Sequence, residues 1–136
     1  MAPATRKQIV RALFEEGWNR QHFTAIAPQL APALTFHVRG ATHHTDLAHL
    51  QHAVAAWHRA FPDLTFEIVT IIAEGDQLAA NLRMSGTQHD TWREIPACGH
   101  HFHVEAMFFF CFAGDQIVEL WEVYDELAVR AQLQSQ

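Results

Sequence analysis

Residues 45–85 read TDLAHLQHAVAAWHRAFPDLTFEIVTIIAEGDQLAANLRMS, and the spacing of apolar residues changes within this stretch. Before Pro62 the apolar side chains recur every three or four residues, as on one face of a helix. They are Leu47, Leu50, Val54, Trp57 and Phe61. This spacing predicts a helix that has Thr45 as its N-cap and ends at Pro62, because proline cannot continue a helix.

After Pro62 the apolar period is two residues, which predicts strands joined by tight turns. The predicted strands are residues 64–73, 78–85, 101–112 and 117–124, and the turns are residues 74–77 and 113–116. A long loop at about residues 88–99 separates the two hairpins.

The N-terminal third of the chain adds helices and one short strand. A first helix begins after Thr5, and its apolar face is Ile9, Val10, Leu13, Phe14 and Trp18. The other expected elements are a short helix at residues 23–30, a strand at 34–38, a polar loop at 40–44 and a C-terminal helix at 125–133. Helices followed by long strands predict an α+β fold, with the helices packed on one face of a curved antiparallel sheet.

The composition narrows the class of protein. A length of 136 residues suits one domain, and 49% hydrophobic residues exclude a disordered chain. The net charge is −6 and the nine basic residues are scattered, so we expect neither nucleic acid nor an anionic membrane as a partner. Residues 106–113 form the longest apolar run, far shorter than a membrane span. The polar N-terminal residues 1–8 do not resemble a signal peptide, so we expect a cytoplasmic protein.

The last predicted strand holds a candidate acid. Residues 117–125 read IVELWEVYD, and on a strand Trp121, Val123 and Asp125 share one face. If this face lines a pocket, its apolar wall raises the pKa of the Asp125 carboxyl towards the range of a general base. Alternatively, Asp125 caps the C-terminal helix, since aspartate is a favoured N-cap. The two roles are compatible.

Several segments resemble one enzyme family in their order and spacing. They are EEGWNR at 15–20, LTFH at 34–37, WHRAFPDL at 57–64, EGD at 74–76, SGT at 85–87, Gly99, and FAGDQIVELW at 112–121 before Asp125. Together they resemble the polyketide cyclases related to nogalonic acid methyl ester cyclase. These cyclases share a cone-shaped fold with nuclear transport factor 2 and ketosteroid isomerase.

The resemblance implies a closed apolar cavity between the helices and the sheet. It also implies that Asp125 is the general acid/base, which removes a proton from a carbon flanked by carbonyl groups. The enolate then closes a ring by intramolecular aldol condensation on a small hydrophobic substrate, without metal or cofactor. His37 matches a position where the family often has a histidine facing the cavity, and we expect it to assist.

The aromatic residues supply candidates for the cavity wall. The expected substrate-binding residues are Phe14, Trp18, Phe36, Trp57, Phe61, His103 and Trp121. The aromatic residues in this set also suit an ordinary hydrophobic core, and in a hollow cone some residues serve both purposes.

Other interpretations remain open. The chain could be a non-catalytic small-molecule-binding protein in which Asp125 is only a cap. An epoxide hydrolase-like site would use Arg83, Asn81, Glu105, Tyr124 and Asp125 around a water. A third possibility is a metal site, since histidines on a strand can ligate zinc or nickel; the candidates are His100, His101 and His103 beside Glu105. We favour a protein without a metal.

One strand is apolar on both faces. Phe108, Phe109 and Phe110 follow one another, so aromatic side chains point to both sides of the sheet. A strand with two apolar faces needs a cover on each. One cover is the core, and for the other we expect a second copy of the chain, in a homodimer formed through the outer sheet face.

Overall fold

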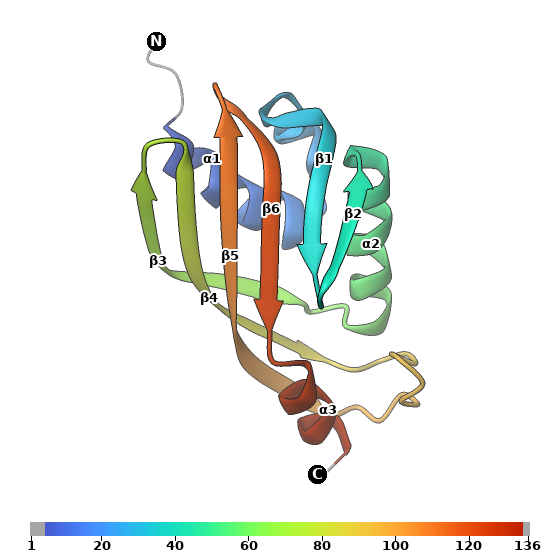
Figure 1. The fold of residues 1–136 in the computed structure, drawn as a ribbon. Coiled ribbons are helices and arrows are strands. Elements are labelled where there is room, and N and C mark those ends of the chain that lie inside the picture. The colour runs from blue at the N-terminus through green and yellow to red at the C-terminus, as the bar shows by residue number, and fades with distance from the viewer. Residues whose placement is uncertain (1–4, 135–136) are drawn as a thin grey trace.

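A six-stranded sheet is the main feature of the computed structural model, which describes residues 5–134 (Figure 1). The strand order is β2-β1-β6-β5-β4-β3. The strands are β1 (Leu30–Val38), β2 (Ala41–Thr45), β3 (Thr65–Glu74), β4 (Gln77–Thr87), β5 (His101–Ala113) and β6 (Gln116–Tyr124). The expected α+β fold is confirmed. The sheet is mixed rather than wholly antiparallel, because β1 pairs with β6 in parallel.

Helices cover one face of this sheet (Figure 1). They are α1 (Arg6–Ala12) with its π-helical continuation η1 (Leu13–Trp18), and α2 (Leu47–Ala60). The C-terminal helix α3 (Glu126–Gln134) lies at the end of the sheet where β6 finishes. As predicted, Thr5 caps α1, and the side chain of Gln8 completes a capping box.

Three local predictions are corrected. The short helix expected at 23–30 consists of two 3₁₀ turns, Phe23–Ala25 and Ala27–Gln29, followed directly by β1. Residues 40–44 were expected as a loop but lie mostly in the edge strand β2. Asp46, not Thr45, caps α2, because its Oδ1 accepts a hydrogen bond from the His49 N–H at 2.9 Å.

The turn between β1 and β2 explains how this edge strand forms. Arg39 and Gly40 both have positive φ, 52° and 75°, as in the type I′ turn of a two-residue hairpin. Val38 is therefore paired with Ala41, and β2 runs back along β1.

Aromatic rings fill the core beneath α1 and η1. Phe108 lies at the centre of this packing, with its ring 4.9 Å from that of Phe14 and 5.8 Å from that of Phe66. Phe110 stacks on Phe108 at 5.9 Å, whereas Phe109 lies on the opposite face of the sheet beside Trp121. Aromatic side chains therefore fill the region beneath α1 and η1. A cavity that can hold a ligand lies instead next to β2 and α2.

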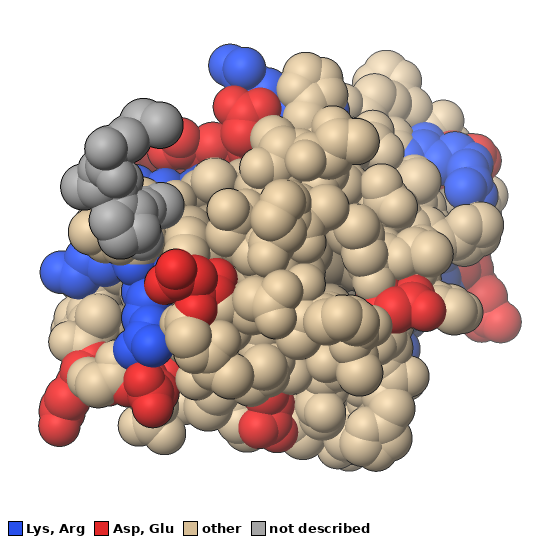
Figure 2. All heavy atoms as spheres, turned by 90° about the horizontal axis from the view of Figure 1, so that it is seen from above, with Lys and Arg blue, Asp and Glu red and all other residues tan. Residues whose placement is uncertain are grey.

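Charged side chains are dispersed on the surface. On the face seen from above, they occur singly or in small mixed groups among uncharged residues (Figure 2). None of the helices within residues 5–134 is long and apolar enough to cross a membrane. Residues 1–4, on which part of the expected cytoplasmic location depends, lie outside the described residues.

Candidate functional site

A buried carboxyl group on β6 is the centre of the candidate site. Glu122 is only 5% exposed and lies on the same side of β6 as the core residue Leu120. Its neighbours Trp121 and Val123 point to the outer face of the sheet, where Val123 is 66% exposed. The alternation of a strand thus turns Glu122 towards the helices.

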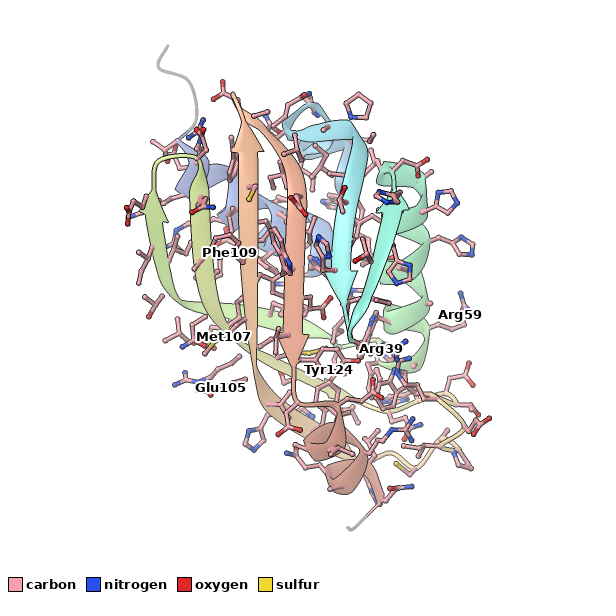
Figure 3. The ribbon with its side chains drawn as sticks, viewed as in Figure 1. Arg39, Arg59, Glu105, Met107, Phe109 and Tyr124 are labelled. Carbon is pink, nitrogen blue, oxygen red and sulfur yellow. The ribbon has the colours of Figure 1, made fainter. Side chains whose placement is uncertain are left out.

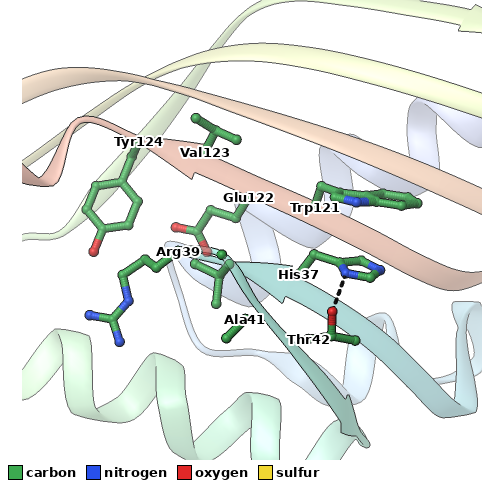
Figure 4. Close-up of a pocket in the computed structure, with 10 residues that line it drawn as sticks. His37, Arg39, Ala41, Thr42, Trp121, Glu122, Val123 and Tyr124 are labelled. Carbon is green, nitrogen blue, oxygen red and sulfur yellow. Dashed lines mark hydrogen bonds between the residues drawn. The ribbon is translucent and has the colours of Figure 1, made fainter.

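Two cavities meet at Glu122. The inner cavity, of about 370 Å³, lies between β1, β2 and α2. Its walls are Trp18, Phe36, Val38, Leu50, Ala53 and Glu122, with His43, His44, Thr45 and His49 on the β2 and α2 side. The outer recess, of about 430 Å³, lies where the β1–β2 turn meets the end of β6 (Figure 4). Val38 and Glu122 belong to the walls of both.

The surroundings of Glu122 change its acidity. Burial raises the pKa of its carboxyl group to about 7, although the positive charges of Arg93 and Arg39 oppose this. Its Oε2 atom has no hydrogen-bond partner among residues 5–134. A buried polar atom without a partner is costly and calls for an explanation. A carboxyl group with a near-neutral pKa in a cavity wall can exchange a proton with a ligand.

Three arginines surround a second carboxylate beside the outer recess. We call Arg39, Arg93 and Arg130, with Glu126 between them, the arginine cluster. The Oε1 atom of Glu126 accepts hydrogen bonds from Arg39 Nη1 at 3.2 Å and from the Tyr124 hydroxyl at 2.9 Å, and Arg93 Nε lies 3.1 Å away. Arg130 Nε is 3.6 Å from the Oε2 atom.

The contacts of Glu126 and Tyr124 determine which of the two groups is ionised. Partial burial of Glu126 opposes ionisation, but the hydrogen bonds from Tyr124 and Arg39 and the nearby arginine charges outweigh it, so its pKa lies below the usual value. Burial raises the pKa of Tyr124 to about 12, which keeps its hydroxyl neutral. At neutral pH the cluster therefore contains three positive charges and one negative charge.

Comparison with known proteins decides the family. A family model described as SnoaL-like polyketide cyclase matches residues 8–133, nearly the whole chain. The chain belongs to this family. No curated protein sequence matches it.

Solved structures share the fold of this SnoaL-like chain. IdmH from Streptomyces antibioticus is 21% identical over 96% of this chain and 99% of its own, with a TM-score of 0.85. A SnoaL-like polyketide cyclase from Agrobacterium tumefaciens is 22% identical over 96% and 99%, with a TM-score of 0.79. TsrD from Streptomyces laurentii is 22% identical over 100% and 99%, with a TM-score of 0.79. At these identities the similarity establishes the cone-shaped fold.

Asp125 of this SnoaL-like chain lies at the start of α3, outside both cavities. Its Oδ1 accepts a hydrogen bond from the Ala128 N–H at 2.9 Å, and its carbonyl oxygen accepts one from Val129 N–H at 3.1 Å. The interpretation of Asp125 as a helix cap is confirmed. The strand ends at Tyr124, so the alternation that groups Asp125 with Trp121 does not extend to it.

His37 lies on the outer face, contrary to the expectation that it faces the space between helices and sheet. It is paired with Trp121 on the neighbouring strand, and the two rings stack at 4.6 Å. Its Nε2 is 2.6 Å from Glu119 Oε2, and its Nδ1 is 3.0 Å from Thr42 Oγ1 (Figure 4). His37 thus lines the outer recess and not the inner cavity.

The expected substrate-binding residues are divided among several places. Trp18 and Phe36 line the inner cavity, and Trp121 lines the outer recess. Three others pack elsewhere: Phe14 and Phe61 are fully buried in the core, and Trp57 packs between Phe61, Trp92 and Tyr124. His103 is exposed on β5, where its N–H donates a hydrogen bond to Gln132 Oε1 at 2.8 Å.

The residues of the epoxide hydrolase alternative do not form one site. Arg83 and Glu105 are partners across β4 and β5, but both are exposed. Arg83 also pairs with Glu67 at 3.5 Å, whereas Tyr124 donates its hydrogen bond to Glu126. The histidines of the metal alternative also diverge. His100 Nδ1 lies 2.6 Å from the Leu133 carbonyl oxygen, and His101 Nδ1 lies 2.9 Å from Thr87 Oγ1. Within residues 5–134, no group of three potential ligands is arranged to hold a metal ion.

Proposed function

We propose that this protein is a cofactor-independent cyclase whose general acid/base is Glu122. The substrate is a hydrophobic, carbonyl-rich small molecule held in the inner cavity against Trp18 and Phe36. The observation that carries the proposal is the buried carboxyl of Glu122 in the wall of the inner cavity, with a pKa of about 7 and no hydrogen-bond partner for its buried Oε2 among residues 5–134. Membership of the family supports the reaction class.

The proposed reaction is an intramolecular aldol condensation. The Glu122 carboxylate removes a proton from a substrate carbon that lies between two carbonyl groups, and the carbonyl groups delocalise the resulting negative charge. The enolate carbon then forms a bond to an aldehyde or ketone carbon of the same molecule. The protonated Glu122 returns its proton to the new alkoxide oxygen, which restores the carboxylate.

The environment of Glu122 suits this proton transfer. A general base is most effective when its pKa lies near the working pH, and about 7 meets this condition. The apolar walls of the inner cavity can hold the substrate folded, with the two reacting carbons close together. Moving the acid/base role from Asp125 to Glu122 leaves the chemistry implied by the family unchanged.

The variant Asp125→Asn tests whether Asp125, rather than Glu122, is the general acid/base. Asparagine caps helices as well as aspartate does, so we expect α3 and the folded state to be retained. Turnover of anthraquinone-type β-keto esters should stay within about twofold of the wild type, because Asp125 takes no part in proton transfer. Product formation would be followed by absorbance. Loss of turnover with an unchanged thermal midpoint would return the catalytic role to Asp125.

We also propose that the outer face of the sheet forms a homodimer. Ile72, Met107 and Val123 are 64%, 55% and 66% exposed on this face. Phe109 and Met107 both belong to β5 on this face (Figure 3). The ion pair of Arg83 with Glu67 lies further along the strands. In a two-fold dimer the same patch lies on both partners. The edge of this patch has a positive and a negative charge, so it can pair with the same edge of the second copy.

The variant Met107→Asp tests the dimer. Because Met107 is exposed, the substitution should leave each protomer folded but place a charge in the centre of the apolar interface. Sedimentation is expected to show a dimer for the wild type and for the control Met107→Leu, and a monomer for Met107→Asp. A wild-type monomer, or an aspartate variant of unchanged mass, would contradict the dimer.

A further inference from the structure

The arginine cluster has more positive charge than its single carboxylate neutralises. Arg39, Arg93 and Arg130 are all within 3.6 Å of Glu126, and none of them forms another ion pair among the described residues. Arg93 and Arg39 also act on the carboxyl of Glu122, but its burial leaves it only partly ionised at neutral pH. Such a surplus of positive charge favours the binding of an anion.

Arg39 is the arginine of the cluster that lines the outer recess. Its side chain is 48% exposed and lines the recess together with Tyr124 and Glu122 (Figure 4). Among residues 5–134, its only hydrogen bond is from Nη1 to Glu126. A guanidinium group has five N–H donors in a planar fork that matches a carboxylate, so most of its donors remain available to a ligand.

A stacked aromatic pair lines the opposite end of the recess. The rings of His37 and Trp121 stack at 4.6 Å with an angle of 12° between their planes. Thr42 fixes the orientation of His37 from the other strand of the hairpin. A recess with a cation at one end and stacked rings at the other suits a planar molecule with one negative group.

We propose that the outer recess binds aromatic carboxylates, with Arg39 as the residue that contacts the carboxylate. This site is separate from the inner cavity, with which it shares only Val38 and Glu122. Arg93 and Arg130 act through Glu126: they hold it in place, so that Arg39 is not fully neutralised by it. Tyr124 is a positioning residue, because its hydroxyl hydrogen is donated to Glu126.

Occupation of the recess affects the proposed catalytic group. A carboxylate on Arg39 offsets part of the positive charge that favours ionised Glu122, and it adds a negative charge nearby. Binding of an aromatic acid therefore raises the pKa of Glu122. An acidic small molecule would in this way reduce the fraction of protein with an ionised base at neutral pH.

The test compares a charged ligand with a neutral one that has the same ring system and one added methyl group. Binding of 2-naphthoate and of its methyl ester would be measured by isothermal titration calorimetry at low ionic strength. We expect the acid to bind about tenfold more tightly than the ester, because a charge-assisted hydrogen bond to arginine is stronger than a neutral one. The Trp121 indole N–H signal in an NMR spectrum should shift when the acid binds.

Two arginine variants locate the site. Arg39→Asn should bind acid and ester equally well, with the ester affinity unchanged; asparagine tolerates the positive φ of this position. The control Arg59→Asn removes the same charge from α2, outside the cluster, and should keep the tenfold preference (Figure 3). Thermal unfolding of both variants checks that they fold.

Three outcomes would overturn the proposal. They are an equal affinity of the wild type for acid and ester, a preference that survives in Arg39→Asn, and an equal loss of preference in Arg59→Asn. Failure of both ligands to bind at millimolar concentration also contradicts it. None of these measurements depends on turnover, so a failure of this binding proposal would not contradict the proposed cyclase activity.

Discussion

Glu122→Gln is expected to lower the rate of cyclisation by at least about 100-fold while the protein remains folded. General acid–base catalysis contributes about 10²–10⁴ to a rate, and an amide cannot take or return the proton. Glutamine has nearly the same shape, so the inner cavity should keep its volume and its affinity for the substrate. The measurement is kcat together with the ligand dissociation constant.

The matched control is Glu119→Gln on the same strand. Glu119 is only half-buried and contacts His37 on the outer face, so its loss should leave kcat nearly unchanged. If Glu122→Gln turned over substrate at the wild-type rate, Glu122 would not be the base. If Glu122→Gln bound no ligand, its low rate would reflect a damaged cavity and not the loss of proton transfer. The kcat of Glu122→Asp, which keeps a carboxyl group, would then show whether Glu122 is the base.

The same residue should make folding stability depend on pH. Burial raises the folded-state pKa of Glu122 to about 7, against an ordinary value of 4.5 in the unfolded chain. Between these two values the folded state binds more protons than the unfolded state, so stability falls as pH rises through this range. The separation of the two pKa values corresponds to about 3 kcal/mol, which is lost in full above pH 7.

Comparison with Glu122→Gln isolates this effect from the other ionisable groups of the chain, which are the same in both proteins. Urea unfolding of both proteins at pH 4 and pH 8 gives the difference in their free energies of unfolding. We expect this difference to move by about 3 kcal/mol in favour of the glutamine variant at the higher pH. A difference that does not change with pH would show that Glu122 ionises normally.

Most elements of the fold could be predicted from local patterns. The helical and strand periods on either side of Pro62 mark which side chains are buried, and burial is what stabilises both kinds of element. The turn at Gly75 was also predictable, since its φ of 58° is easy only for glycine. The edge strand β2 gave no such signal, because its side chains are nearly all exposed and need no apolar alternation.

The parallel pairing of β1 with β6 could not be read from the sequence. The two strands are far apart along the chain, and nothing in either strand records which partner it takes. This pairing places Phe36 beside Leu120 and His37 beside Trp121, and so decides which residues face the cavity.

The choice between Glu122 and Asp125 depended on this missing information. Strand alternation correctly groups Trp121 with Val123, but alternation alone does not say which face is the inner one. The sequence contained one usable signal: Glu122 alternates with Trp121 and Val123, and it shares its strand face with the apolar residue Leu120. The family resemblance points to Asp125 instead, and the Asp125→Asn variant tests that role.

The most direct test of the account is the pKa of Glu122 itself. The carboxyl carbon of its side chain can be followed by NMR as pH is varied, and its signal can be assigned by its absence in Glu122→Gln. We expect a titration midpoint of about 7, because the carboxyl is buried in the cavity wall. A midpoint near the ordinary 4.5 would mean that the carboxyl is hydrated, and it would contradict the role of Glu122 as the general base.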